Sequence, residues 1–539
     1  MDSHDKIKFL NILELPTEIL CDIVRFLQVP SSANRSKIGW GAETLNQYRA
    51  HAGYPSCCQD IRSARLVCRR FHDLTSPLLF PVLQIRLDRA SLDFADHVSR
   101  SPFLAAGVGA IQVVLQYYSA ELAADLSRFR DQRLEDAERW WASCVRNDEL
   151  WDLGGFDSDD DTVLSLPRSE YRRGIEGYEK IQTAWRNSVK IDESLEYREI
   201  LHRGHQVYRQ KHQEQLSLLT DGFFTRRVAS IMSQLPFPSS LILDDQADLI
   251  DIDCDEVKIL LLTKKNELFR FATSPHQWQT IQRVDTINEV ASKLAPAKLL
   301  SELPVAIHKA GVALRDIRAP CESRIWFTAP DLQDPLRAAC DDLRPACQRL
   351  EVFTFGKPVR STLVGPLTDG AKAHFDRYLG AMLSGPCLTH LELHLGWYSQ
   401  HGRGVHHVGS MLGGLDGSRL KRTTVMDVSL HQAQLEAFCT GLGSELEKVY
   451  LCGVHLLSGR WAGVLDILRD KVSARCMEGK CKVYLRCLAG GEFGPKIRDC
   501  FLHSAVEDGN DLEYLSEHYV SGFEVMENPL RGSEYDILA

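Results

Sequence analysis

An acidic run in the middle of the chain has the residue types of a calcium site. Asp157-Ser158-Asp159-Asp160-Asp161 begins like a calcium-binding loop, which requires Gly at its sixth position and a bidentate Glu at its twelfth. Thr162 and Arg168 occupy those two positions, so calcium binding is not predicted. We expect a solvated loop here, with phosphorylation of Ser158 as an alternative.

Two sets of histidines have the chemistry to bind a transition metal. His202, His205 and His212 lie near one another if their segment is helical, and His401 precedes a further His-His pair in a glycine-rich stretch. Metal sites usually add Asp, Glu or Cys ligands that converge on the histidines, and neither set has them at a matching spacing. We therefore predict surface histidines and no metal or other cofactor.

The chain has 16 cysteines, and their spacing follows no disulfide framework. Residues such as Cys21 and Cys439 stand alone among apolar neighbours, as reduced and buried cysteines do in cytosolic or nuclear proteins. Cys476, Cys481 and Cys487 form a loose cluster, but no Cys/His pair at zinc spacing completes it. We expect free thiols and a cytoplasmic or nuclear protein.

Known catalytic motifs are missing from the sequence. It contains no glycine-rich phosphate loop followed by Lys-Ser/Thr, no Gly-x-Ser-x-Gly elbow and no His-Glu-x-x-His. Residues 409–414 have glycines without the strand and the lysine that a phosphate loop needs. We therefore do not expect an enzyme; the alternative is an active site made by polar groups that meet in one pocket.

Composition and charge exclude two further classes of function. The 539 residues are 44% apolar and 25% charged, with a formal net charge of −10, which gives no general attraction to nucleic acid or to an anionic membrane. Residues 1–9 lack the apolar core of a signal peptide. The most apolar window, residues 102–115, is shorter than the roughly 20 residues that span a bilayer.

The elements that carry a more specific signal lie near the N-terminus. Pro16 and Glu18 suit the first turn of a helix. The following apolar residues cover an unusually broad arc for one short helix, namely Ile19, Leu20, Ile23, Val24, Phe26 and Leu27. A second helix is predicted from about Asp60 to Ser76, where Pro77 ends it. Its four arginines are interpreted as a solvated polar face, and the broad apolar arc favours a partner or a following domain.

These two helices resemble the F-box. The matching residues are Leu15-Pro16-x-Glu18-Ile19-Leu20, Ile23, Phe26-Leu27, then Leu66-Val67-Cys68-Arg69-Arg70-Phe71 and Pro77-Leu78-Leu79-Phe80. In that family the first helix and the Val-Cys-Arg-x-Phe helix dock onto the Skp adaptor of a cullin-RING ubiquitin ligase. The resemblance implies eight adaptor-binding residues: Leu15, Pro16, Ile19, Leu20, Ile23, Leu66, Val67 and Cys68.

One feature departs from the family. A short connection joins the two halves of a typical F-box, whereas residues 29–59 intervene here and are rich in Ser, Gly and Asn. A surface loop accepts such an insertion at little cost in chain entropy. The alternative, from patterning alone, is an ordinary helical cap at the N-terminus.

The middle of the chain predicts a strand and a helical hairpin. Residues 110–115 are short, apolar and β-branched, as in a buried strand. Two amphipathic segments follow: one carries Leu122, Phe129 and Trp140, and the other carries Tyr171 and Trp185. Both have charges between their apolar positions, which is typical of helices that project from a scaffold.

Helix–turn–strand units recur from about residue 225. The predicted strands are 241–243, 314–317, 350–355, 391–395, 425–430, 446–451 and 481–485. Leu388-Thr389-His390-Leu391-Glu392-Leu393 looks like the strand of a leucine-rich repeat, although most units exceed the roughly 20–29 residues of regular repeats. We predict an irregular, leucine-rich-repeat-like solenoid; the alternative is an unrelated α/β domain.

The predicted organisation is that of an α/β protein with two ends. Its parts are an F-box at 11–82 with a loop insertion at 29–59, a linker and first strand at 83–116, a helical hairpin insertion at 117–220, a solenoid at 225–506 and an acidic C-terminal cap or tail at 507–539. The resemblance implies the substrate-recognition subunit of an SCF-type ligase, with a Skp adaptor and a target protein as partners. The alternative is an F-box scaffold that acts outside a ubiquitin ligase.

Overall fold

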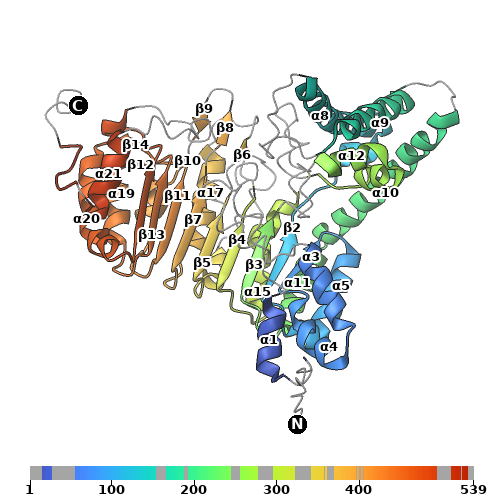
Figure 1. The fold of residues 1–539 in the computed structure, drawn as a ribbon. Coiled ribbons are helices and arrows are strands. Elements are labelled where there is room, and N and C mark those ends of the chain that lie inside the picture. The colour runs from blue at the N-terminus through green and yellow to red at the C-terminus, as the bar shows by residue number, and fades with distance from the viewer. Residues whose placement is uncertain are drawn as a thin grey trace, which may run out of the picture.

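A parallel β-sheet is the centre of the molecule (Figure 1). The computed structural model describes residues 12, 15–26, 55–152, 166–186, 192–244, 255–276, 295–321, 341–356, 359–360, 369–395, 397–399, 402–404, 406–494, 511–523 and 525–531. Nine strands follow one another across the sheet in chain order: β1 (Val82–Arg86), β2 (Ala110–Val114), β3 (Ser240–Asp244), β4 (Asp316–Ala319), β5 (Val352–Phe355), β7 (His390–His394), β11 (Arg422–Met426), β13 (Lys448–Cys452) and β15 (Lys482–Arg486). The chain is therefore a mixed α/β structure on an open parallel sheet.

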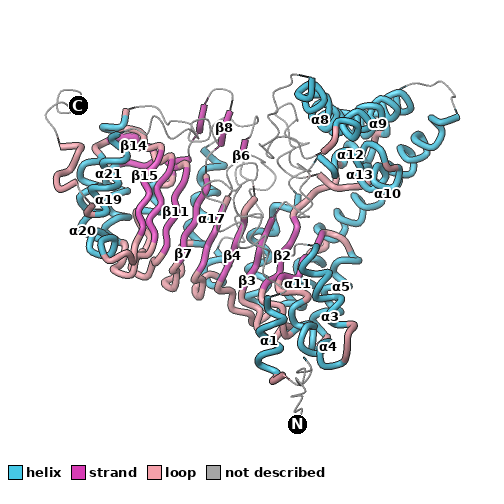
Figure 2. Tube along the Cα trace, viewed as in Figure 1, coloured by secondary structure: helices cyan, strands magenta, loops and turns pink. Residues whose placement is uncertain are grey.

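Side chains alternate between the two faces of this sheet, as strand geometry requires. One set, which includes Phe353, Leu393 and Leu451, is fully buried and belongs to the main hydrophobic core. Helices supply the other side of that core (Figure 2): α5 (Arg89–Arg100), α11 (Phe223–Gln234), α15 (Leu299–Lys309), α17 (Asp369–Met382), α19 (Gln432–Gly441) and α20 (Trp461–Met477). The rings of Phe375 and Tyr378 on α17, for example, lie 5.8 and 5.6 Å from that of Phe355.

The strands predicted from the sequence agree with the sheet in seven cases. β2, β3, β4, β5, β7, β13 and β15 match their predicted ranges within two residues at each end. The predicted strand 425–430 is divided between two strands, because Asp427 adopts a left-handed backbone, with φ of 62°, between β11 and β12 (Val428–His431). The chain turns there and leaves the main sheet. The sheet also takes in β1 and β2, outside the residues 225–506 predicted for the repeat region.

Two small sheets adjoin the main one. One consists of β10 (His406–His407), β12 and β14 (His455–Ser458), and the other of β6 (Val359–Arg360), β8 (Trp397–Ser399) and β9 (Gly402–Gly404). A short helix, α18 (Gly409–Leu412), follows β10.

A helical arm projects from the sheet beside β2 (Figure 1). It contains α7 (Ala120–Ala124), α8 (Leu126–Asp152), α9 (Arg168–Arg186) and α10 (Asp192–Thr220), so both predicted amphipathic segments are helices. Two helices that follow β3 also pack into it, α12 (Asp255–Thr263) against α9 and α13 (Lys265–Ala272) against α10. The arm therefore includes residues beyond the predicted range 117–220. None of the helices in the described part of the chain combines the length and the apolar character needed to cross a membrane.

The C-terminal helix α21 (Asp511–Ser521) covers the last strand of the sheet. Glu517 and Glu513 on this helix accept hydrogen bonds from the backbone N–H groups of Leu485 and Leu488, at 3.1 and 2.8 Å. Glu517 also pairs with Arg486 at 2.6 Å. Acidic residues of the tail therefore satisfy backbone N–H groups of β15 and of the segment that follows it.

Candidate docking surface of the N-terminal helices

The N-terminal helices form a small unit with its own core, at the foot of the molecule in Figure 1. They are α1 (Thr17–Phe26), α3 (Pro55–Arg65), α4 (Arg69–Thr75) and the 3-10 turn η3 (Ser76–Leu78). Leu20, Val24 and Phe71 are buried together, and Leu15, Cys68, Leu74 and Leu78 pack against them. α3 begins at Pro55, so residues 55–59 of the predicted loop insertion are helical; residues 29–54 lie outside the described part of the chain.

The helix predicted from about Asp60 to Ser76 is confirmed only in part: α3 ends at Arg65 and α4 begins at Arg69, so the helix is broken at residues 66–68. Leu66 and Val67 close the end of α3 by donating hydrogen bonds to the carbonyls of Ser63 and Ala64, both at 3.1 Å. Cys68 is fully extended, with φ of −164°, and its carbonyl accepts the first hydrogen bond of α4. The break places Leu66 and Val67 at a corner of the unit instead of within a helix.

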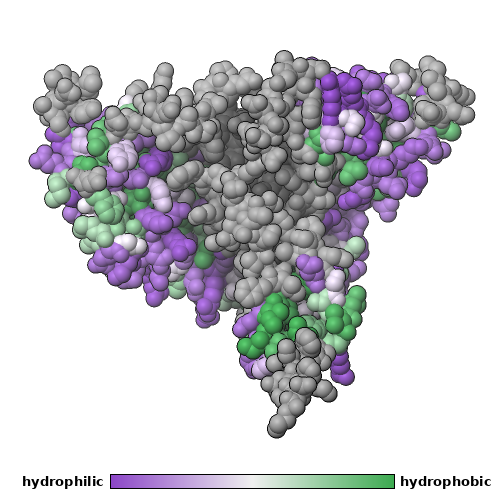
Figure 3. Space-filling view, viewed as in Figure 1, coloured by the Kyte–Doolittle hydropathy of each residue, from purple (hydrophilic) through white to green (hydrophobic). Residues whose placement is uncertain are grey.

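Four apolar side chains of this unit face outward. Ile19 and Ile23 on α1 are 46% and 39% exposed, and Leu66 and Val67 at the corner are 87% and 67% exposed. Ile19 and Ile23 are four residues apart and so share one helix face. Hydrophobic residues gather at this end of the molecule in Figure 3, where Figure 1 places α1. We call Ile19, Ile23, Leu66 and Val67 the N-terminal apolar surface.

The other predicted adaptor-binding residues divide into three groups. Pro16 is exposed beside the N-terminal apolar surface, and Leu15 and Cys68 are half-buried between that surface and the core. Leu20 was predicted to contact the adaptor, but it is fully buried against Phe71 in the core. It supports the surface from behind, because a side chain with no exposed area touches no partner.

Arginines hold the unit together, which the predicted solvated face did not anticipate. Arg70 on α4 donates to the Leu15 carbonyl at 2.8 Å and to the Thr17 hydroxyl at 3.1 Å. Arg65 on α3 donates to the Ser76 hydroxyl at 3.1 Å. These bonds tie α1 to α4 and α3 to η3, so they fix the relative positions of the outward apolar residues.

The unit is attached to the sheet by close packing. A Cβ on Gly107 would lie 1.5 Å from the Pro77 carbonyl oxygen, so only glycine allows this approach of the loop before β2 to η3. The Gly109 N–H donates to the Pro81 carbonyl at 3.0 Å, next to the start of β1. The N-terminal apolar surface therefore has a fixed place relative to the sheet.

The histidines that were considered as possible metal ligands do not form a metal site within the described residues. Among the described residues, no three His, Cys, Asp or Glu side chains converge as a metal site. His205 is half-buried instead of lying on the surface: it bonds the Leu122 carbonyl at 3.0 Å and packs on Phe129, and burial lowers its pKa. The acidic run 157–161 and His401 lie outside the described residues.

The cysteines differ from the prediction at one position. Ten described cysteines are free, among them Cys439, whose burial raises its thiol pKa to about 12 and makes it unreactive. Cys476 and Cys481 are hydrogen-bonded, and this bond lowers the pKa of Cys476. Cys487 is disulfide-bonded, contrary to the expectation of free thiols, and its partner is not among the cysteines whose side chains are described.

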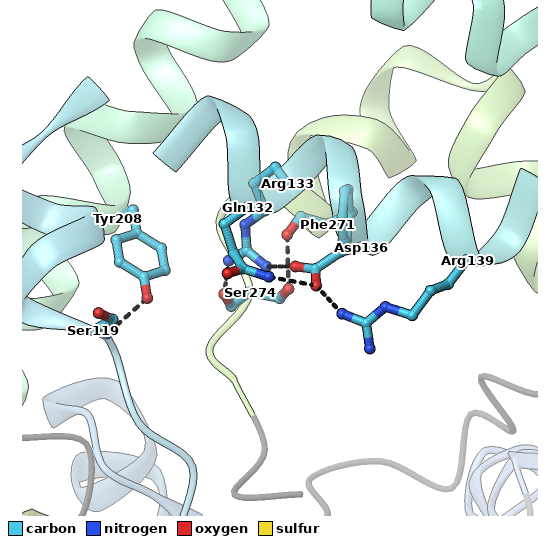
Figure 4. A network of polar contacts seen from close by, with 8 residues as sticks. All are labelled: Ser119, Gln132, Arg133, Asp136, Arg139, Tyr208, Phe271 and Ser274. Atoms are coloured by element: carbon cyan, nitrogen blue, oxygen red, sulfur yellow. Dashed lines mark hydrogen bonds and ion pairs between the residues drawn. The ribbon is translucent and has the colours of Figure 1, made fainter. Parts of the chain in front are cut away.

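The most elaborate polar network lies in the helical arm and is structural (Figure 4). The guanidinium of Arg133 is buried between the rings of Phe129, Tyr208 and Phe271, at 5.7, 5.3 and 5.2 Å. It also donates to the Ser274 carbonyl and to Asp136. Its 2% exposure leaves no room for a ligand. Sequence patterning missed this residue because a lone arginine on a charged helix looks like surface.

A pocket lies in the same arm, between α9, α10 and the α12–α13 junction. It is lined by Arg173, Glu176, Gly177, Lys180, Tyr197, Thr263 and Lys264, and its volume is about 180 Å³. Ligand pockets usually hold about 300–1,000 Å³. Its lining contains no nucleophile paired with a base, so the pocket gives no mechanism for catalysis.

No known protein family, characterised protein or solved structure matches this chain. The resemblance to the F-box therefore depends on the residues named above. The structure adds which of those residues face outward and which are buried.

Proposed function

We propose that this chain is the substrate-recognition subunit of an SCF-type, cullin-RING ubiquitin ligase. The N-terminal apolar surface would bind a Skp adaptor, and the C-terminal part of the molecule would hold a target protein. The observation that carries the proposal is the outward orientation of Ile19, Ile23, Leu66 and Val67, which are four of the eight residues that the F-box resemblance assigns to the adaptor.

Energetics favour a partner on this surface. Burying apolar area stabilises a complex by roughly 25 cal/mol per Å², and contiguous apolar patches on a monomer usually mark an interaction site. The surface is also preorganised, because the two halves that carry it are joined through Arg70. A fixed surface spends less free energy on ordering when it binds.

The main sheet supports the second part of the proposal, in which the C-terminal part of the molecule holds a target protein. Strands that follow one another in chain order, each joined to the next by a helical crossover, are what stacked strand–helix units produce. We infer an irregular, leucine-rich-repeat-like solenoid in which the helical arm is an insertion between β2 and β3 and α21 is the cap. A target held near the ubiquitin-charged enzyme would react through proximity, without a catalytic residue in this chain.

The experiment is co-purification of the full-length chain with a Skp adaptor expressed in the same cytoplasm. The test variant combines Ile23→Asp with Val67→Asp, because burying an unpaired carboxylate costs several kcal/mol. We expect the adaptor to be lost, with the thermal unfolding profile unchanged. Leu20→Asp is unsuitable, since it would place the charge inside the core of the unit.

The matched control carries the same two charges on exposed apolar residues elsewhere, Phe237→Asp with Leu457→Asp. We expect this control to retain the adaptor. Equal retention by both variants would contradict the docking assignment. Adaptor binding that recruits no cullin would favour the alternative of an F-box scaffold outside a ligase.

A further inference from the structure

The last three strands of the main sheet carry a row of cationic side chains on the face opposite the helices. Arg422 on β11, Lys448 on β13 and Lys482 on β15 are in register, and the residues that follow them, Thr423, Val449 and Val483, are buried. Neighbouring strands lie about 4.8 Å apart. Three basic side chains therefore stand side by side along the beginning of these strands.

Two of these cations form no close ion pair with a carboxylate among the described residues. Arg422 pairs with Glu447 at 3.0 Å on the exposed edge. The Lys448 ammonium lies 5.4 Å from the centre of the Tyr450 ring, and Lys482 is exposed. Like charges opposite one another on neighbouring strands are destabilising, so an anion placed along this row would be stabilised.

An aromatic surface lies next to the row. Tyr450 and Tyr484 are in register two residues further along β13 and β15, with ring centres 5.7 Å apart. Both are half-exposed. Tyr450 also packs against the buried pair Met426 and Cys452, which holds the ring in place. The face therefore offers cations and apolar area side by side.

The charges on the middle strands of the same face are satisfied internally. Arg318 and Asp316 on β4 are paired at 2.7 Å, and His394 and Glu392 on β7 are paired at 2.8 Å. Both pairs are largely buried. Within the described part of this face, unpaired positive charge is thus concentrated on β13 and β15, in a chain whose net charge is −10.

We propose that Arg422, Lys448 and Lys482, together with Tyr450 and Tyr484, bind an acidic segment of a partner protein. Asp or Glu side chains would lie on the cations and an apolar side chain on the tyrosines. The identification of this partner with a ubiquitination target rests on the proposed function, whereas the binding surface itself does not.

The charge pattern favours a peptide over nucleic acid. Glu447 lies beside the row and would repel a continuous phosphate backbone. Nucleic-acid binding usually takes several phosphate contacts, each of which adds to the salt dependence, and the row has three cations. A row of three strands spans about 10 Å, the length of three extended residues at about 3.3 Å each, so acidic residues two or three apart would reach the outer cations.

The test measures fluorescence anisotropy with the full-length chain and a fluorescein-labelled peptide, Gly-Glu-Leu-Glu-Gly-Glu-Leu-Glu-Gly. We expect binding that weakens at least tenfold when Gln replaces Glu in the peptide. We also expect at least tenfold weaker binding to the variant Lys448→Glu with Lys482→Glu. The milder pair Lys448→Gln with Lys482→Gln should show a smaller loss and covers the case in which the charge reversal disturbs the strands.

The matched control is Lys180→Glu with Lys264→Glu, which makes the same change of net charge on exposed lysines of the helical arm. It should bind the peptide like the original chain. The proposal would be overturned if the β13–β15 variants bound the peptide as tightly as the original chain does. It would also be overturned if the Gln peptide bound as tightly as the Glu peptide, or if no binding were seen at 1 mM peptide. A single-stranded RNA of 20 nucleotides that binds more tightly and is lost with the same lysines would overturn it as well.

The two proposals fail separately. The variant Ile23→Asp with Val67→Asp should lose the adaptor and keep the peptide, and the lysine variants should do the reverse. If the apolar-surface variant and the lysine variants both lost the adaptor, or both lost the peptide, the substitutions would disturb the whole chain. That result would remove the support for two separate surfaces.

Discussion

The N-terminal helices and the helical arm are both helical units attached to the same sheet, and they treat their apolar residues in opposite ways. The arm buries its aromatic side chains so completely that Arg133 is enclosed among them. The N-terminal helices have a hydrophobic cluster of only three buried residues and leave Ile19, Ile23, Leu66 and Val67 outside. A unit with so small a core gains stability from a partner, whereas the arm is complete without one.

The largest expected effect comes from removing the buried cation of the arm. Arg133→Ala should lower the free energy of unfolding of the arm by about 3–5 kcal/mol, because it leaves a cavity and takes a buried partner from Asp136. The measurement is hydrogen exchange of α8, α10 and α13 by mass spectrometry, with guanidinium titration. Arg139→Ala, whose side chain is 53% exposed in its pair with Asp136, is the control and should cost about 1 kcal/mol or less. Equal effects of the two substitutions would mean that the network is not the core of the arm.

The second effect concerns the core of the N-terminal helices. Leu20→Ala should cost about 2–4 kcal/mol, since Leu20 is fully buried against Val24 and Phe71. We expect faster hydrogen exchange in α1 and α4 and unchanged exchange in the arm. Loss of protection in the arm as well would show that the two units unfold together, and the comparison between them would then fail.

Sequence patterns predicted those parts of the fold that depend on local periodicity. The alternation of apolar residues in β5, β7 and β13 indicates strands because one face of each strand is buried. The helices of the arm were predictable for the same reason. α12 and α13 were not assigned to the arm, because the packing of a segment against helices far away in the chain leaves no trace in its own periodicity.

The candidate docking surface was predictable in its residues and not in its geometry. Val67 and Cys68 fit the apolar side of one continuous helix as well as a corner between two helices, so the helix break was not evident. Leu20 and Ile19 are adjacent apolar residues, and only the position of Phe71 decides that Leu20 is interior. Arg133 was missed because burial of a charge depends on three rings from separate helices.

A third and smaller effect is a pH-dependent contribution to the stability of the arm. Asp148 joins α8 to α9 through Arg168 at 2.7 Å and Arg172 at 3.1 Å, and the hydrogen bond from Arg168 is the main reason that its pKa is lowered. A lowered pKa in the folded state stabilises the arm above the ordinary carboxyl pKa, and this contribution is lost as the pH falls through the folded value. Asp148→Asn should cost about 0.5–1 kcal/mol at pH 7 and less at about pH 3, below the ordinary carboxyl pKa, as measured by exchange protection in α8 and α9. An equal cost at both pH values would assign the effect to packing.

The smallest expected effect is also the sharpest test of the comparison. Ile19→Ser and Ile23→Ser should each change the free energy of unfolding by less than about 0.5 kcal/mol, because 46% and 39% of the two residues is already exposed. The same change in the arm, Ile181→Ser, should cost several kcal/mol, because that side chain is fully buried. Chemical denaturation of the isolated chain provides the measurement. A cost above about 1 kcal/mol for the α1 substitutions would mean that these residues pack within the chain itself, and the N-terminal apolar surface would no longer be open to a partner.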